Sequence, residues 1–146
     1  MTRGFLLSSM LSALLFACIG CAAKSGNTAA GQDDRDRVEV LYLHGRQRCA
    51  TCRAIEEHAA ETVKTLFADE QAKGTVVFRS VDISDPQNEY IAEEYQAAWS
   101  SLFVNRWRNG SQTSENLTGF AFANALTAPD RFRSTLAEKI ANALKE

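Results

Sequence analysis

Residues 38–56 read VEVLYLHGRQRCATCRAIE, and this stretch decides the fold of the chain. Its first six residues are mostly apolar and include two valines, a pattern typical of a strand that is buried on both faces of a sheet. A polar loop follows, and two cysteines separated by two residues, Cys49 and Cys52, then open a helical pattern. The stretch therefore predicts a strand, a short loop and a helix, with a dithiol at the start of the helix.

The residues after the dithiol extend this unit into a strand, a helix and a second strand. Apolar residues recur at steps of three and four from Ile55 to Phe67, which predicts one amphipathic helix that ends near Gly74. Residues 75–81 then form another apolar run. Such a βαβ unit strongly favours a right-handed crossover between parallel strands.

The second half of the domain supplies the remaining elements. Ser84 or Asp85 can cap a second helix, with Pro86 in its first turn. The other predicted elements are strands at 102–107 and 112–117, a tight turn at Asn109-Gly110 and a helix from Pro129. The predicted class is α/β, with a central mixed sheet in the order β-α-β-α-β-β-α and flanking helices. This is the order of a thioredoxin-like fold.

Length and charge limit the classes of function. A chain of 146 residues has room for one domain. The formal net charge of −2 argues against nucleic acid as the main partner. The sequence has neither a G-x-G-x-x-G motif nor a P-loop, so we expect no bound flavin or nucleotide cofactor.

The first 37 residues predict export and attachment to a membrane. Residues 1–17 combine Arg3 with a short uncharged apolar run, as an export signal does. The following Leu15-Phe16-Ala17-Cys18 resembles a bacterial lipobox, which predicts lipidation at Cys18, with Cys21 as the competing site and an ordinary cleaved signal as the alternative. Residues 18–37 predict a flexible tether, and residues 38–146 the folded domain. We expect this domain on the extracytoplasmic (periplasmic) side of the cell envelope.

The dithiol is the candidate catalytic site. A sulfur at a helix N-terminus is stabilised as a thiolate, so we predict that Cys49 attacks disulfides and Cys52 resolves the mixed disulfide. The charges of Arg46, Arg48 and Arg53 could lower the pKa of Cys49 further, or these arginines could simply belong to a solvated loop.

Two other uses of the dithiol stay open. Both cysteines could bind a metal or metalloid, with His44 and His58 as the other soft ligands available in the domain. They could also form a purely structural disulfide, as in many exported domains. His44 could instead tune the thiols or be a hydrogen-bonded surface residue.

Trp99 and Trp107 could form a platform on which a substrate binds. We expect Trp99 and Trp107 to pack in the core or on the hairpin.

Beyond general thioredoxin likeness, residues 38–56 resemble a family of small bacterial lipoproteins, the nitrophenyl-compound nitroreductase subunits found with permeases for aromatic aminoarsenicals. The most specific part is Arg48–Cys52 with His44 ahead of it, and similar residues recur at 81–83, Tyr95, 117–118 and 129–132. The resemblance implies a subunit that helps to reduce a nitro group of an aromatic arsenical to an amine. It would either transfer electrons to a reductase or membrane partner or hold the substrate. An independent thiol-disulfide oxidoreductase that acts on envelope proteins is the alternative. Only Cys49 and Cys52 carry over as site residues.

One feature departs from ordinary thioredoxins. These proteins have a cis-proline before their third core strand, whereas this chain has Ser100-Ser101 there and no proline between Pro86 and Pro129. A cis peptide without proline costs about 3 kcal/mol, so we expect none at this position. The change leaves the dithiol more open to a metal or metalloid.

Overall fold

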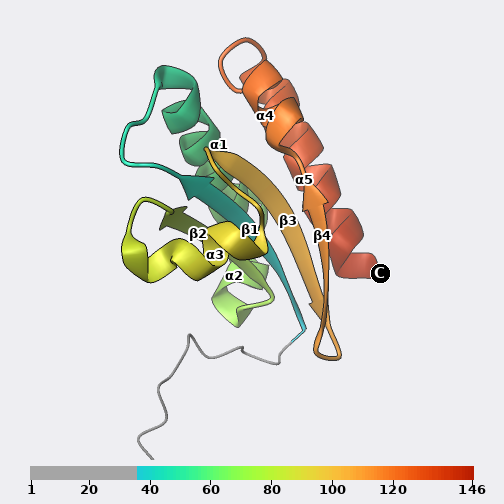
Figure 1. The fold of residues 1–146 in the computed structure, drawn as a ribbon. Helices are drawn as coiled ribbons and strands as arrows, with labels where there is room; N and C mark the ends of the chain where they lie inside the picture. Colours follow the sequence, from blue (N-terminus) through green and yellow to red (C-terminus); the bar gives the residue numbers. More distant parts are fainter. Residues whose placement is uncertain (1–35) are drawn as a thin grey trace, which may run out of the picture. The chain divides into compact units, whose positions relative to one another are not determined.

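The computed structural model describes residues 36–146, and the predicted signal peptide, the lipidation sites Cys18 and Cys21, and nearly all of the predicted tether lie outside them. No helix in this described part is long and apolar enough to cross a membrane. Its elements, in chain order, are β1 (Arg37–His44), α1 (Ala50–Leu66), α2 (Ala68–Lys73), β2 (Val76–Asp82), the 3-10 turn η1 (Pro86–Asn88), α3 (Glu89–Glu94), β3 (Ser101–Arg108), β4 (Ser111–Asn116), α4 (Thr118–Asn124) and α5 (Pro129–Lys145) (Figure 1).

The four strands form one mixed sheet in the order β2-β1-β3-β4. β1 is parallel to β2 and antiparallel to β3, and β3 is antiparallel to β4. Six consecutive residues of β1 are buried, which confirms the prediction of a strand buried on both faces. The α/β class, the mixed sheet and the flanking helices are as predicted.

The two faces of the sheet carry different cores. On one face, α1 and α5 pack against each other and against the strands (Figure 1). That core includes Tyr42, Ile55, Val104, Phe132 and Leu136. The other face carries a smaller apolar cluster to which α3 contributes: Leu41, Leu43, Val81, Ile91, Ala97 and Phe103.

The helix predicted to reach Gly74 is in fact two helices. The chain leaves the helical conformation at Phe67, whose φ is −130° and ψ is 34°, and α2 then begins. Phe67 is 8% exposed and turns into the core, while α2 buries no residue. The apolar stripe therefore ends at Phe67, and only the stop at Gly74, in the left-handed region with φ 74°, is as predicted.

Two further elements differ from the prediction. The second helix starts with the 3-10 turn η1, capped by the Asp85 side chain with Pro86 at its start, and α3 follows. The short helix α4 occupies residues that were not assigned to any element. Asn116 stabilises its beginning by accepting a hydrogen bond from the backbone N–H of Thr118 at 2.9 Å.

Candidate functional site

The candidate site forms where β1 leaves the sheet and α1 begins. Cys49 is the N-cap residue of α1, with an extended backbone at φ −73° and ψ 173°. Its Sγ accepts a hydrogen bond from the backbone N–H of Cys52 at 3.2 Å. The sulfur thus satisfies one of the N–H groups that every helix leaves unpaired at its start.

The second sulfur lies beside the first. Both thiols are free, and their Sγ atoms are 2.8 Å apart. Cys49 is exposed, whereas Cys52 is 7% exposed. The arrangement has the asymmetry predicted from the sequence, with one accessible and one buried thiol.

Hydrogen bonding lowers the pKa of the Cys49 thiol. The pKa of Cys49 is lowered first by a hydrogen bond from the Cys52 side chain and then by the Cys52 backbone N–H, and Thr51 adds smaller contributions. Such bonds favour the charged form of a thiol. A thiolate at this exposed position can attack a disulfide or bind a thiophilic ion.

The arginines near the dithiol act differently from the prediction. Arg48 forms an ion pair with Glu56, which also accepts a hydrogen bond from the Ser80 hydroxyl at 2.6 Å. Arg53 donates to the backbone carbonyl of Arg48 at 2.8 Å. These guanidinium groups fasten the loop to α1 and β2, and hydrogen bonds within the cysteine motif lower the pKa of Cys49 in their place.

The charge of Arg46 acts on Asp82, at the end of β2. Hydrogen bonds from Ser84 lower the pKa of Asp82, and the charges of His44 and Arg46 add to that effect. The three arginines still border a broad groove of about 730 Å³ beside the start of α1, lined by Arg46, Arg48, Arg53, Glu56, Glu57, Ala60 and Phe78.

Tyr42 is a site residue that the sequence analysis did not identify. Its side chain is fully buried, and its hydroxyl donates to the backbone carbonyl of Cys52 at 2.8 Å. Burial raises the pKa of Tyr42 to about 12, although a hydrogen bond from Ser100 works in the other direction. The signal was the alternation of β1, which places Tyr42 on the same face as Val38 and Val40, in the core beneath α1.

The two histidines do not join the cysteines. The His44 ring lies against Tyr42, with ring centres 5.8 Å apart, and its Nδ1 is 3.1 Å from the Gly45 carbonyl. His58 Nδ1 is 3.1 Å from the Arg133 guanidinium. Among residues 36–146 no three His, Cys, Asp or Glu side chains are grouped as metal ligands, so the possible Cys2His2 site is not assembled.

The prediction made for the two tryptophans is confirmed for one of them and wrong for the other. Trp107 lies on the hairpin, with the Arg37 guanidinium 5.0 Å from its ring centre, and its packing role is confirmed. Trp99 is 70% exposed, so the expectation that it packs in the core or on the hairpin is wrong. It directly precedes Ser100, which is buried. No peptide bond in the described part of the chain is cis.

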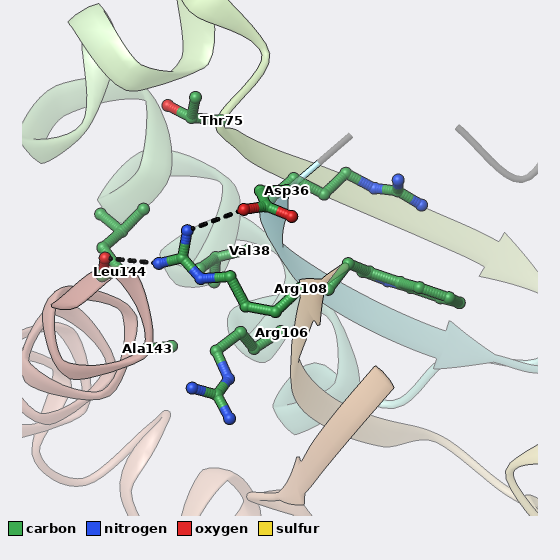
Figure 2. Close-up of a pocket in the computed structure, with 9 residues that line it drawn as sticks. Asp36, Val38, Thr75, Arg106, Arg108, Ala143 and Leu144 are labelled. Carbon is green, nitrogen blue, oxygen red and sulfur yellow. Dashed lines mark hydrogen bonds and ion pairs between the residues drawn. The ribbon is translucent and has the colours of Figure 1, made fainter. Parts of the chain in front are cut away.

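A second cavity, of about 240 Å³, lies at the opposite end of the sheet (Figure 2). Arg108 crosses it and donates to the Asp36 carboxylate at 3.1 Å and to the Leu144 carbonyl at 3.0 Å. These bonds tie the start of β1 to the end of α5. The lining contains no cysteine or histidine, and its charged groups are used in holding the fold together.

Comparisons of the chain with models of protein families and with curated proteins found no match.

Proposed function

We propose that this chain is a thioredoxin-like thiol-disulfide redox protein in which Cys49 attacks and Cys52 resolves. The observation that carries the proposal is the pair of sulfurs 2.8 Å apart, one exposed at a helix N-cap and one buried. A structural cysteine pair does not need an exposed member with a lowered pKa, whereas a nucleophile does.

The arrangement of the elements supports the thioredoxin-like assignment. The sheet order β2-β1-β3-β4, with β2 parallel to β1 and the hairpin β3-β4 on the other side, fits the predicted order of elements. The dithiol lies between the central strand β1 and α1, at the carboxyl end of β1. Open α/β sheets place their functional groups at the carboxyl ends of the strands.

The proposed reaction moves two electrons. The Cys49 thiolate attacks one sulfur of a partner disulfide, forms a mixed disulfide and releases the other partner sulfur as a thiolate. The Cys52 thiol loses its proton and attacks Cys49 Sγ, which closes the Cys49–Cys52 disulfide and releases the second partner thiol. The partner is reduced, and the dithiol is oxidised and must be reduced again by an electron donor.

We base the proposed location and the proposed partner on the sequence and on its resemblance to a family. Lipidation at Cys18, or at Cys21, would hold the domain at the envelope membrane. The resemblance suggests an electron-transfer subunit of a reductase that converts a nitroaromatic arsenical to an amine. That reduction takes six electrons and one dithiol supplies two, so the chain would deliver electrons repeatedly to a partner protein.

Binding of a thiophilic ion is the second candidate function. Adjacent reduced sulfurs are suitable ligands for trivalent arsenic or for zinc, and Cys49 is accessible. The described residues offer no third ligand near them, which favours an ion that two thiolates can hold.

A redox titration separates the two functions. The chain with Cys18→Ser and Cys21→Ser, whose remaining thiols are Cys49 and Cys52, would be equilibrated in thiol-disulfide buffers with and without arsenite or zinc. A reversible two-electron transition within about −120 to −270 mV supports electron transfer. Thiols that resist oxidation in these buffers but are tightly protected by arsenite or zinc would replace the redox proposal with ion binding.

Capture of the partner tests the assigned roles. In a Cys52→Ser variant the mixed disulfide at Cys49 cannot be resolved, so partner proteins remain attached in a form that reductant releases. Cys49→Ser is the matched control and should capture nothing at the same position. If both variants capture the same set of proteins, Cys49 is not the specific attacking thiol.

A further inference from the structure

Tyr42 links the dithiol to the core of the domain. Its hydroxyl is fully buried and lies on β1, yet it bonds to a carbonyl in the first turn of α1. A helical carbonyl usually accepts only the N–H four residues later. The bond from Tyr42 is therefore an additional bond to the residue that carries the buried sulfur.

Ser100 is a second group that acts on the Tyr42 hydroxyl. It is 7% exposed, it directly precedes β3, and its side chain lowers the pKa of Tyr42 against the effect of burial. The bond that joins β1 to α1 is the one from the Tyr42 hydroxyl to the Cys52 carbonyl. A buried hydroxyl left without a partner costs free energy, so this bond holds the Tyr42 ring and the Cys52 backbone in one arrangement.

We propose that Tyr42 is a positioning residue for the resolving step, because it keeps Cys52 Sγ aligned with Cys49 Sγ while a partner is attached to Cys49. This inference rests on the proposed thiol-disulfide function. Attachment of a partner to Cys49 disturbs the contact between the two sulfurs, whereas the bond from Tyr42 to the Cys52 backbone remains and holds Cys52 in place. Reactions between groups held at attack distance depend steeply on such alignment.

The test uses 5,5′-dithiobis(2-nitrobenzoate), a symmetric disulfide that releases a coloured thiolate at each step. Attack by Cys49 releases one thionitrobenzoate and leaves the other in a mixed disulfide, and attack by Cys52 on Cys49 Sγ releases the second. One equivalent of this reagent would be mixed with the chain carrying Cys18→Ser and Cys21→Ser, and the two phases followed by stopped flow.

In this background Tyr42→Phe should leave the rate of the first phase unchanged and slow the second phase by about five- to tenfold, since it removes one buried hydrogen bond. Ser100→Ala should slow the second phase by a smaller factor, and Ser100→Thr, which keeps the hydroxyl, should restore it. Tyr90→Phe on α3, where the ring is 51% exposed, is the matched control and should change neither phase.

The outcomes separate this inference from the proposed function. A chain with intact Tyr42 that shows no second phase would overturn the redox function and the role of Tyr42 together. Two phases that are both unchanged in Tyr42→Phe would overturn the role of Tyr42 alone. Equal slowing of both phases, with a lower unfolding midpoint, would also overturn it, because a general loss of stability does not distinguish the two steps.

Discussion

The two faces of the sheet each carry a tyrosine whose pKa burial raises to about 12, and the two tyrosines differ in what they touch. Tyr42 bonds to the backbone beneath an exposed thiol. The Tyr95 hydroxyl accepts hydrogen bonds from Asn105 at 2.8 Å and from Gln112 at 2.5 Å. Asn105, which is fully buried, also donates to the Glu39 carboxylate at 3.1 Å and accepts from Ser114 at 2.7 Å.

The network around Tyr95 is closed, because its polar groups use one another as partners. Such a network specifies the packing of β1, β3 and β4 but presents no reactive atom. The network around Tyr42 instead ends at a residue whose sulfur takes part in the proposed reaction. The contrast indicates that a buried polar group affects the thiol-disulfide reaction only where it is bonded to a residue that reacts. Four predictions test this difference between the two networks.

The largest effect is expected from Cys49→Ser, which should abolish the release of thionitrobenzoate. Serine keeps the N-cap role, since its oxygen also accepts the backbone N–H of Cys52, but it does not attack disulfides at neutral pH. The thermal unfolding midpoint of the reduced protein should therefore stay close to that of the parent chain. Residual release through Cys52 at a comparable rate would show that the two thiols are interchangeable.

Asn105→Ala should have the opposite result. It should lower the stability of the fold strongly and leave the rates of thionitrobenzoate release unchanged. The substitution leaves the Glu39 carboxylate with only the Arg79 guanidinium, 3.8 Å away, and leaves Ser114 without its acceptor. We expect the free energy of unfolding in urea to fall by about 2–3 kcal/mol.

Asn142→Ala, on the exposed side of α5, is the matched control for that loss and should stay within about 0.5 kcal/mol of the parent. The rates of both phases in folded Asn105→Ala should equal those of the parent chain. A selective change in the second phase would mean that the two faces are coupled.

The sequence predicts the parts of this molecule whose signals are local. The apolar runs of β1 and β2, the Asn109-Gly110 turn and Pro129 at the start of α5 are each set by neighbouring residues, and the structure confirms them. The burial of Cys52 and the N-cap position of Cys49 follow from a helix that starts at the motif.

The remaining features depend on contacts between distant segments. The break at Phe67 follows from where the core ends, and α4 follows from the docking of Thr118, whose hydroxyl accepts a hydrogen bond from the backbone N–H of Leu102 at 3.0 Å. The bond from Tyr42 to Cys52 joins a strand to a helix, and one-dimensional patterns do not show which tyrosine makes it. The partners of Arg48 and Arg53 were missed for the same reason, because the Glu56 carboxylate and the Arg48 carbonyl bind their guanidinium groups.

The third prediction concerns the pH dependence of the two thiols. Because hydrogen bonds lower the pKa of Cys49, its thiolate persists at a pH where an ordinary thiol is protonated. The rate of alkylation of Cys49 by iodoacetamide should rise with pH with a midpoint below about pH 8.5, the ordinary pKa of a thiol. At pH 6 mass spectrometry of the digested protein should show Cys49 modified at least about tenfold faster than the buried Cys52. Equal rates would contradict the assigned roles.

The smallest effect is expected from Tyr95→Phe, the counterpart of Tyr42→Phe on the other face. It removes the acceptor of two hydrogen bonds, but Tyr95 and Gln112 are only partly buried, so water can replace part of what is lost. We expect a loss of about 1 kcal/mol in urea unfolding and no change in either phase of thionitrobenzoate release. The pair of variants removes the same atom from two tyrosines whose pKa is raised to about 12, so a difference in the second phase reflects the surroundings of each hydroxyl. If Tyr95→Phe slowed the second phase as much as Tyr42→Phe, the resolving step would respond to the stability of the whole sheet, and the contact between Tyr42 and Cys52 would have no special role.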